Sequence, residues 1–468
     1  MLDQSFSSHN LELIYSFESR KGNIDITTMP ETYLALIKQA EEVKREVCSL
    51  KTKKDRTQDE DDLLLAKKEL LTVIAEKKKI NLQNYLEGIE EQINSHDFKF
   101  TLKKFVAKNG KEVFKLDTDS HVQLFAIKQL QYNIRHTFKV KQANRHNILA
   151  NIKTFLNCRI PLYVIRTDIS SFYESIPHQL LLPKVFNNTL LSYKSKAFIK
   201  GILREYESLK DTTLVAHECG VPRGIGISSY LSELYMRDLD AKIVNKREVM
   251  FCARYVDDIF LILTAMPSGK ELSNFYKELT DDFASYGLLL KQPNDASGKC
   301  SLLDFTKDHT LETMTYLGYS LNMKRKNGRT STTFSLSDKK KDRYKKKIDN
   351  AIDHFNTLSK CDVKQAYHDL LDALNLFTGN IKLFKSKSGV KVGLYYSNDL
   401  LDNMEDLDLL TDYLHKHPVN PYIGLKDRAN IIANLSKRIQ KINFTDRWKT
   451  RKMFSFSLQR IQELEKWL

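Results

Sequence analysis

The order of apolar and polar residues divides the chain into a helical beginning, a middle of short apolar stretches and a helical, basic end. Apolar residues recur at three- and four-residue steps within residues 34–50 and 82–93, which is the spacing of one face of a helix. Residues 51–62, KTKKDRTQDEDD, are all polar or charged. The pattern predicts two antiparallel helices over about residues 31–95, joined by a solvated connection and serving packing or oligomerisation.

A β-hairpin is predicted next, in FVAKNGKEVFKL at residues 105–116. Its apolar residues flank the dipeptide Asn109-Gly110, which is a strong short-range signal for a hairpin. The lysines of this hairpin are compatible with solvated strand residues and also with a basic clamp. They are Lys108, Lys111 and Lys115.

From about residue 160 the chain becomes richer in β-branched, apolar stretches. A Gly-rich turn that enters an amphipathic helix lies among them, at residues 224–243. Strands that alternate with helices in this way favour an α/β or α+β domain with one central sheet. The predicted strand segments are IPLYVIRTDI (160–169), MFCARY (250–255), IFLIL (259–263) and TMTYLGYSL (313–321).

Beyond about residue 335 the pattern becomes mostly helical and basic. The segment SDKKKDRYKKKIDNAIDHF (337–355) begins with Ser337, which suits the N-cap of a helix. Its apolar stripe, at helical spacing, consists of Tyr344, Ile348, Ile352 and Phe355.

Net charge narrows the class of partner. The chain has 74 Lys and Arg against 59 Asp and Glu, a net charge of +15, which favours a polyanion, nucleic acid before a membrane. Six scattered cysteines form no CxxC pair and no zinc spacing, so reduced thiols are expected. Because no signal-like N-terminus and no bilayer-spanning apolar run is present, a soluble, cytoplasmic protein without membrane contact is expected.

Asp257 and Asp258 interrupt an otherwise apolar segment, RYVDDIFLIL (254–263). An isolated Asp-Asp between apolar runs is most often a turn. At the tip of a hairpin, however, two adjacent carboxylates cannot both ionise cheaply without a cation beside them. A third carboxylate, Asp168, ends the predicted strand at 160–169, although on its own it is more typical of a helix N-cap.

Three carboxylates at two strand ends suit a site for two divalent ions. Two metal ions about 3.5–4 Å apart activate an attacking oxygen and stabilise a leaving oxygen in phosphoryl transfer. Magnesium prefers oxygen ligands and takes substrate phosphates into its coordination shell. The sequence therefore predicts two Mg²⁺ ions held by Asp168, Asp257 and Asp258.

Four short motifs follow one another along the chain. They are Asp168-Ile-Ser-Ser-Phe-Tyr-Glu-Ser-Ile, Gly220-Val-Pro-Arg-Gly-Ile-Gly-Ile-Ser-Ser, Tyr255-Val-Asp-Asp and Tyr316-Leu-Gly-Tyr. In this order they resemble the first aspartate motif, the nucleotide-pocket motif, the Tyr-x-Asp-Asp box and the primer-grip hairpin of reverse transcriptases. A single one of these motifs is weak evidence for the family, whereas all four in this order are specific evidence. The resemblance covers about residues 100–350.

The resemblance implies an α+β, right-hand polymerase that acts as an RNA-directed DNA polymerase. Residues 1–159 would form an N-terminal region and fingers, 160–322 the palm with an antiparallel sheet, and 323–468 a helical, basic thumb and C-terminal region. The implied partners are an RNA template or an associated non-coding RNA, dNTPs and a DNA product. A second copy or a partner protein would meet the N-terminal helices.

The same resemblance implies roles around the aspartates. The carbonyl of Ile169 would be a further metal ligand. The ring of Tyr173 would lie under the sugar and exclude a 2′-hydroxyl, although a core tyrosine is its ordinary interpretation. The candidate triphosphate contacts are Lys111 and Lys115, and the candidate phosphate contacts of nucleic acid are Arg145, Lys339, Lys340 and Lys345, for which solvated helix positions are the alternative.

The nucleotide-pocket motif departs from the family pattern at one position. Where the family usually has Pro-Gln-Gly, this chain has Pro222-Arg223-Gly224. Arginine adds a positive charge and a planar fork of donors. Such a fork suits a nucleotide phosphate or a template base edge, and it is also compatible with altered template use.

Two segments near the C-terminus resemble motifs of bacterial anti-phage reverse transcriptases of the abortive-infection and "unknown group" lineages. They are LFTGN (376–380) and GLYYSNDLL (393–401), which are also typical of a helix stop and of a strand followed by a turn. Two other functions stay open. One is a template-independent or protein-primed polymerase of the same fold, and the other is a non-catalytic RNA-binding scaffold, which the intact carboxylates disfavour.

Overall fold

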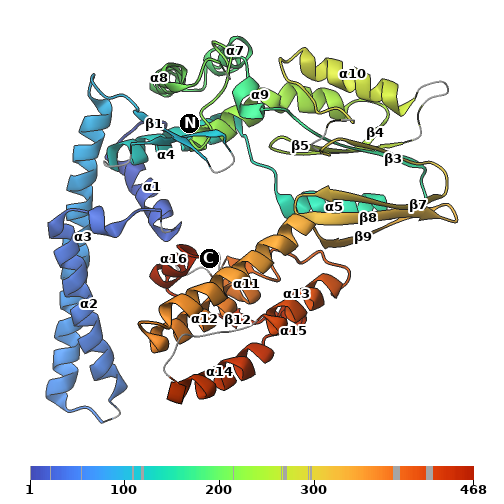
Figure 1. The fold of residues 1–468 in the computed structure, drawn as a ribbon. Coiled ribbons are helices and arrows are strands. Elements are labelled where there is room, and N and C mark those ends of the chain that lie inside the picture. The colour runs from blue at the N-terminus through green and yellow to red at the C-terminus, as the bar shows by residue number, and fades with distance from the viewer. Residues whose placement is uncertain are drawn as a thin grey trace. The chain divides into compact units, whose positions relative to one another are not determined.

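Two compact units make up the chain in the computed structural model, and each is assembled from segments distant in sequence (Figure 1). The first unit comprises residues 1–142, 170–241 and 282–289, and the second comprises 143–169, 242–281 and 290–468. The three contiguous domains expected from the sequence stay a prediction. The structure describes residues 2–21, 23–53, 55–107, 110–117, 121–213, 215–264, 266, 271–293, 295, 298–382, 390–417 and 425–468.

The predicted helical pair of the first unit is present as α2 (Glu31–Thr52) and α3 (Gln58–Asn94), which lie side by side (Figure 1). The connection is shorter than predicted, because residues 58–62 belong to α3, where the acidic side chains of the first turn complement the helix dipole. Thr57 and Glu60 close a capping box there. The role of the α2–α3 pair in oligomerisation or partner binding stays a prediction. The buried residues that pack together in one cluster of the pair are Ala40, Val43, Val47, Leu50, Leu64 and Ile74.

The predicted hairpin is formed by β1 (Leu102–Val106) and β2 (Glu112–Leu116), which pair antiparallel. Gly110 in the connection has a φ of 78°, whereas Lys108 and Asn109 lie outside the described residues. The other described elements that lie in or begin in the first unit are α1 (Ser8–Lys21), η1 (Ile26–Thr28), α4 (His121–Phe138), α6 (Phe172–Ser175), α7 (His178–Phe186), α8 (Tyr193–Leu209) and α9 (Gly226–Val244).

A four-stranded antiparallel sheet lies in the second unit, in the order β4-β5-β3-β6. Its central strands are almost entirely buried, as their continuous apolar sequences require, since both faces of the strands are covered. The strands are β3 (Leu162–Asp168), β4 (Val249–Tyr255), β5 (Asp258–Thr264) and β6 (Ser301–Phe305).

A second, three-stranded sheet is separate from the first, in contrast to the single central sheet that was predicted. Its strands β7 (His309–Tyr316), β8 (Tyr319–Lys326) and β9 (Arg329–Leu336) follow one another through two-residue turns. Each strand of this sheet pairs with its neighbour in sequence. The three-stranded sheet therefore forms its hydrogen bonds without the four-stranded sheet.

The C-terminal helices share a hydrophobic core with the four-stranded sheet and the β7-β8-β9 sheet. In α11 (Asp338–Leu358) the predicted stripe Tyr344, Ile348, Ile352 and Phe355 is buried, and Ser337 occupies the N-cap position without a side-chain hydrogen bond. None of the described helices is long and apolar enough to cross a membrane. The remaining elements of this unit are α5 (Arg145–Leu156), α10 (Leu272–Ala284), α12 (Val363–Thr378), β10 (Asn380–Lys382), β11 (Lys391–Gly393), α13 (Glu405–Lys416), α14 (Leu425–Gln440), α15 (Phe444–Lys449), β12 (Met453–Phe454) and α16 (Leu458–Glu465).

Candidate active site

Asp257 and Asp258 lie at the tip of the β4–β5 hairpin. Tyr255 pairs with Asp258, which leaves Val256 and Asp257 as a two-residue turn. Val256 has a φ of 61°, a left-handed value that is rare for a β-branched residue and costs about 1–3 kcal/mol. Its carbonyl accepts a hydrogen bond from Nη1 of Arg254 at 2.9 Å. The paired strands and the Arg254 side chain therefore hold the turn in a conformation that valine does not favour.

Strand register brings Asp168 to this hairpin. Asp168 faces Asp258 directly in the antiparallel β3–β5 pair, and the N–H of Ile169 donates to the carbonyl of Asp257 at 3.0 Å. One carboxylate oxygen from each acid lies within 4.8 Å of the others. The structure thus brings together the three acids that the sequence predicted, here called the aspartate centre.

The charge of Asp258 is poorly compensated within the protein. Burial raises the pKa of Asp258 to about 6; Arg166 opposes the rise, while Asp257 and Asp168 add to it. The nearest guanidinium nitrogen of Arg166 is 3.8 Å from Oδ1 of Asp258. That oxygen is buried and has no hydrogen-bond partner among the described residues. A buried acceptor of this kind is costly unless a proton or a cation satisfies it.

Lys299 is a member of the site that sequence reasoning missed. Its Nζ donates to Oδ2 of Asp168 at 2.6 Å. Burial opposes its charge, but the hydrogen bond and the negative charges of Asp168, Asp258 and Asp257 raise the pKa of Lys299. It lies 131 residues from Asp168 and outside every motif, so no spacing in the sequence could have linked the two.

The aspartate centre fits a hard divalent cation. All three side chains offer carboxylate oxygens, the ligands that Mg²⁺ prefers. The unsatisfied Oδ1 of Asp258 and the crowding of like charges are the features that a bound cation would relieve. The identity and number of the ions stay predictions, as does the ligand role of the Ile169 carbonyl.

Lys111 and Arg223 line one cavity of about 220 Å³ in the first unit, which also includes Glu174 and Tyr206. Nε and Nη2 of Arg223 donate to the two carboxylate oxygens of Glu174, each at 3.0 Å. The guanidinium carbon lies 5.1 Å from the centre of the Tyr173 ring. Arg223 was predicted from the sequence, whereas its partner Glu174 was missed, although it stands in the first aspartate motif.

Lys115, the second triphosphate candidate, is not among the residues that line this cavity. Its Nζ lies 5.2 Å from the ring centre of Phe105 on the neighbouring strand. Contacts of Lys111 and Lys115 with a triphosphate stay predictions. The structure thus brings Lys111 and Arg223 together, and it directs Lys115 to the face of the hairpin that carries Phe105.

Arg145 holds the turn between β7 and β8. Its Nε and Nη2 donate to the carbonyl of Leu317 at 2.8 and 2.6 Å, and its guanidinium carbon lies 5.2 Å from the ring centre of Tyr319. Leu317 and Gly318 have φ values of 44° and 79°, the conformation of a tight hairpin turn. Arg145 therefore has an intramolecular role, and its predicted contact with a phosphate stays a prediction.

Lys339 and Lys340 are neighbours on α11 but lie in different environments. Lys340 is buried, donates to the carbonyl of Ser397 at 2.9 Å, and lies 5.0 Å from the ring centre of Tyr319. Burial, aided by Arg145 and Arg343, lowers the pKa of Lys340 to about 7. Lys339 is exposed. It lines a groove of about 660 Å³, here called the basic groove, together with Arg145, Thr315, Leu317, Gly318, Ser337, Lys340, Asp342, Arg343, Lys346 and Ser397.

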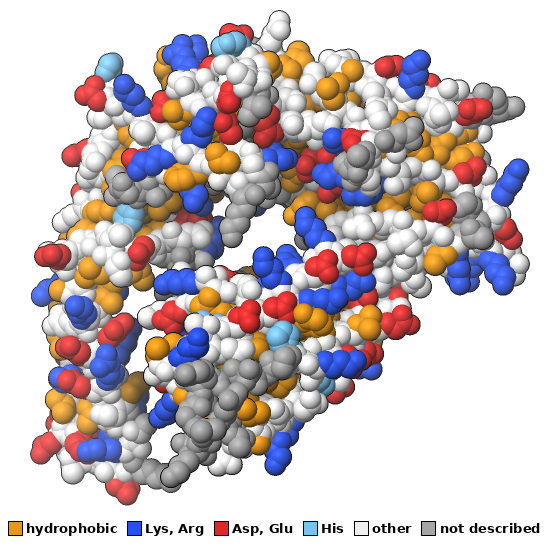
Figure 2. Space-filling model, viewed as in Figure 1, with side chains coloured by type: hydrophobic (Ala, Val, Ile, Leu, Met, Phe, Trp, Pro, Cys, Tyr) orange, Lys and Arg blue, Asp and Glu red, His pale blue; other side chains and the backbone are white. Residues whose placement is uncertain are grey.

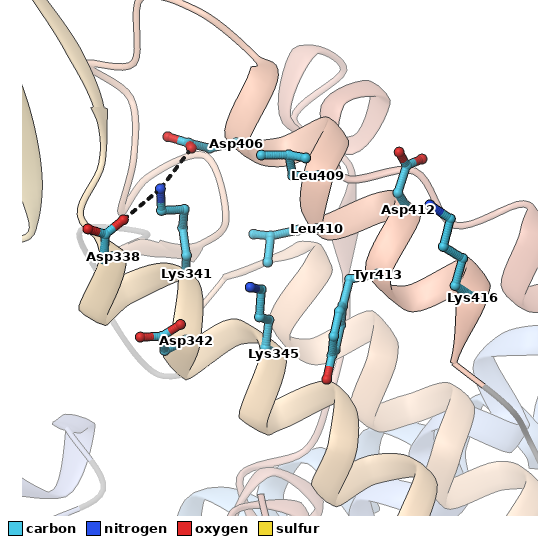
Figure 3. Close-up of a pocket in the computed structure, with 10 residues that line it drawn as sticks. All are labelled: Asp338, Lys341, Asp342, Lys345, Asp406, Leu409, Leu410, Asp412, Tyr413 and Lys416. Atoms are coloured by element: carbon cyan, nitrogen blue, oxygen red, sulfur yellow. Dashed lines mark ion pairs between the residues drawn. The ribbon is translucent and has the colours of Figure 1, made fainter.

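Lys345 faces a second pocket, between α11 and α13, of about 460 Å³ (Figure 3). Its Nζ lies 5.6 Å from the ring centre of Tyr413. In the same pocket Lys341 pairs with Asp338 at 2.8 Å and with Asp406 at 3.3 Å. Acidic and basic side chains are likewise interspersed over the face drawn in Figure 2. The predicted nucleic-acid contacts of the three lysines stay predictions, but only Lys339 of the three is exposed in the basic groove.

The two C-terminal motifs meet around a small sheet in which β10 pairs with β11 and β12. The α12 helix ends at Thr378 and is followed by Gly379, and the side chain of Asn380 accepts from the N–H of Tyr395 at 2.9 Å. Asn398 is fully buried and donates to the Tyr344 hydroxyl at 3.1 Å. The motif residues thus occupy structural positions, as the helix-stop and turn interpretation expects.

Residues 119–321 match the family model of reverse transcriptase (RNA-dependent DNA polymerase), and this segment contains the aspartate centre. The predicted right-hand polymerase fold and the predicted enzyme class, a nucleotidyltransferase, are confirmed for this domain. No curated protein sequence matches the chain.

Solved telomerase structures are also similar to the chain. The truncated apo telomerase of Candida tropicalis is 15% identical (49% of this chain, 55% of that chain, TM-score 0.34). The telomerase of Candida albicans in complex with a telomeric RNA fragment is 12% identical (74% and 64%, TM-score 0.35), and the apo telomerase of Candida tropicalis is 12% identical (78% and 60%, TM-score 0.37). The chain therefore spans less than two thirds of each of these telomerase chains.

Proposed function

We propose that this chain, a nucleotidyltransferase by its reverse transcriptase domain at residues 119–321, extends a nucleic-acid 3′-hydroxyl with dNTPs on an RNA template. The 3′-oxygen would attack the α-phosphorus, and the bond from that phosphorus to the β-phosphate oxygen would break to release pyrophosphate. The observation that carries the proposal is the aspartate centre, where three carboxylates converge within 4.8 Å at the meeting of β3 with the β4–β5 hairpin.

Asp168, Asp257 and Asp258 would hold two Mg²⁺ ions, with the Ile169 carbonyl as a further ligand. Such ions supply positive charge for the attacking and leaving oxygens. The protein itself fixes the acids. Strand register sets Asp168 opposite Asp258, and Lys299 orients one oxygen of Asp168.

The incoming nucleotide would be met by residues of the first unit. The cavity that contains Lys111 and Arg223 offers ammonium and guanidinium donors, which suit the oxygens of a triphosphate. Tyr173, five residues after Asp168, would lie against the sugar and exclude a 2′-hydroxyl. These roles rest on the motif resemblance together with the shared cavity.

Template and product would be held through phosphates. The basic groove carries Lys339, Arg343 and Lys346, which suit sequence-independent contacts with a nucleic-acid backbone. The net charge of +15 would support association with an RNA template or an associated non-coding RNA.

We place the enzyme in bacterial anti-phage defence, acting in the cytoplasm. The support is the resemblance of residues 376–380 and 393–401 to C-terminal motifs of defence-associated reverse transcriptases. A test is the survival of phage-infected bacteria that express the wild-type chain or the Asp257→Asn variant. Protection by wild type and not by the variant is expected, and protection by neither would contradict the defence role.

Templated synthesis is tested with pure, nuclease-treated protein, Mg²⁺, all four dNTPs and primed RNA templates of contrasting sequence. Sequencing of the products should show that their composition follows the template. Products that stay the same across templates, or homopolymers made from a single dNTP without RNA, would instead establish the template-independent alternative. Absence of any product, together with retained RNA binding, would favour the non-catalytic scaffold.

A further inference from the structure

We propose that Glu174 is a positioning residue for nucleotide selection, which holds Arg223 against the Tyr173 ring and thereby fixes the ring that faces the sugar. This inference rests on the proposed polymerase function. All three residues belong to the first unit, and each step of the argument uses contacts within that unit.

Backbone hydrogen bonds first join the two motif segments that carry these side chains. The carbonyl of Tyr173 accepts from the N–H of Val221, and the carbonyl of Ile176 accepts from the N–H of Gly220, each at 2.8 Å. Gly220 has a φ of 90°, and a Cβ there would lie 2.8 Å from the Tyr206 hydroxyl oxygen. The close approach therefore depends on glycine, and it sets the chain that leads to Arg223 beside α6.

The backbone of Arg223 is fixed from a second side, by β2. Its carbonyl accepts from the N–H of Phe114 at 2.7 Å. The next residue, Gly224, has a φ of 99°, and a Cβ there would lie 2.5 Å from the Phe114 carbonyl oxygen. The Arg223 side chain thus starts from a defined point, and only its own torsion angles are left to be restrained.

Glu174 restrains those torsion angles. Two parallel hydrogen bonds of 3.0 Å join Nε and Nη2 of Arg223 to the two oxygens of Glu174. The side chains are 25% and 23% exposed, so water competes only partly for the pair. A bidentate pair fixes the plane of the guanidinium as well as its position. A neutral amide at position 174 could accept one of the two hydrogen bonds but not both.

The fixed guanidinium supports the ring of Tyr173. Its carbon lies 5.1 Å from the ring centre, within the range of a cation–π contact. The α6 helix that carries Tyr173 has four residues and follows Ser171, whose φ is 45°. One helical turn has little stability of its own, so contacts from outside the helix must hold the ring. Arg223 supplies one such contact only while Glu174 keeps it in place.

Glu174 also balances charge in the cavity. Without its carboxylate, the positive charge of Arg223 would share the cavity with Lys111 and lose its nearest counter-charge. Repulsion and rotamer freedom would then both favour movement of Arg223 away from Tyr173. The expected result is a ring with several orientations, which discriminates less well between a hydrogen and a hydroxyl at the 2′ position.

The test compares kcat/KM for a dNTP and for the matching rNTP in wild type, Glu174→Gln, Arg223→Gln and the double variant. We expect each single variant to lower the dNTP preference about tenfold, the effect of losing roughly one charge-assisted hydrogen bond. The double variant should lose no more than either single variant, because both substitutions break one pair. Tyr173→Ala sets the scale for complete loss of selectivity.

A matched control is Glu207→Gln. The Glu207 side chain is 27% exposed, close to the value for Glu174, and it pairs with the buried side chain of Lys210 at 2.6 Å. The substitution therefore removes a carboxylate from a different ion pair of the first unit. Its dNTP preference should equal that of wild type. Thermal unfolding of each variant shows whether it is folded. If Glu174→Gln does not fold, Arg223→Gln tests the same ion pair.

The inference would be overturned by a folded Glu174→Gln variant with unchanged dNTP preference, or by effects of the two substitutions that simply add. A loss of selectivity in Glu207→Gln of the same size would also overturn it. Failure of the wild-type protein to make DNA is a different outcome, which contradicts the proposed polymerase function before any variant is compared.

Discussion

The aspartate centre and the two arginines singled out from the sequence differ in how the protein satisfies their charges. In the aspartate centre, Oδ1 of Asp258 is buried without a hydrogen-bond partner among the described residues. Arg223, by contrast, donates two hydrogen bonds to Glu174, and Arg145 donates two to the carbonyl of Leu317.

The difference teaches how a matched motif should be interpreted. A charge that the protein leaves unsatisfied in a buried place needs a ligand, because an uncompensated buried charge is costly. A charge that is already paired with good geometry acts first on the fold. Sequence motifs identify both kinds of residue, and only the surroundings separate them.

The largest effect should follow from substitution within the aspartate centre. Asp168→Asn or Asp257→Ala should lower dNTP incorporation about a hundredfold or more, since loss of a ligand in a two-metal site costs several kcal/mol of transition-state stabilisation. Primer extension at saturating Mg²⁺ measures the effect. Activity above a tenth of wild type would contradict the assignment of the aspartate centre.

The control for this prediction is Asp304→Asn. Asp304 lies on β6 of the same sheet, opposite Tyr163, which is five residues before Asp168 on β3. Its carboxylate accepts hydrogen bonds from Thr306 and takes no part in the aspartate centre. Primer extension should stay near the wild-type rate.

The next effect should appear in stability. Arg145→Ala removes both hydrogen bonds to the Leu317 carbonyl, and we expect it to destabilise the protein by about 1.5–3 kcal/mol, the range for hydrogen bonds to charged groups. Arg145→Lys should recover only part of the lost stability, because the lysine ammonium lacks the planar fork of donors that a guanidinium has. A urea midpoint equal to that of wild type would place Arg145 among the ligand contacts instead.

Lys340 offers a test through pH. Its pKa of about 7 in the folded protein lies below the ordinary value of 10.5, so between these values the unfolded chain binds more protons and stability should rise with pH. The groups facing it are Arg145, Arg343, Asp399 and Tyr319; burial raises the pKa of Tyr319 to about 12, outside this range.

Substitution isolates the contribution of Lys340. Urea midpoints measured at intervals from pH 7 to pH 10 should rise less steeply in Lys340→Met than in wild type. The exposed neighbour Lys339 provides the control, and Lys339→Met should keep the wild-type slope. Equal slopes for wild type and Lys340→Met would show that Lys340 stays charged in the folded protein.

The smallest effect is expected in the basic groove. Lys346 is exposed there, and Lys346→Ala should reduce the slope of log K against log salt concentration for a primed RNA template by about one, without changing the urea midpoint. Lys200→Ala, which removes the same charge from the exposed surface of α8, should leave the slope unchanged. Equal slopes for both variants would remove Lys346 from the phosphate contacts.

The sequence predicted the aspartate centre because Asp257 and Asp258 are adjacent and Asp168 ends an apolar strand within the first of the four ordered motifs. The partners of the arginines could not be predicted, since no spacing or residue type links Glu174 to Arg223 or the Leu317 carbonyl to Arg145. Such pairs arise only when the whole chain has folded.

The separate β7–β8–β9 sheet was missed for a related reason. Strand periodicity in TMTYLGYSL predicts a hairpin, but it does not tell which sheet the hairpin joins. The left-handed φ of Val256 was also beyond prediction, because valine is among the residues least suited to it.

The strand order of the four-stranded sheet has a consequence for synthesis of the protein. β3 is central, yet its neighbours β5 and β6 end at Thr264 and Phe305. At about 5–20 residues per second, the ribosome needs on the order of ten seconds to complete β5, the first of these neighbours, after β3. During that interval an apolar strand that ends in Asp168 has no partner from its own sheet. Chaperone binding or early pairing with another chain would therefore act on this segment before the aspartate centre can assemble.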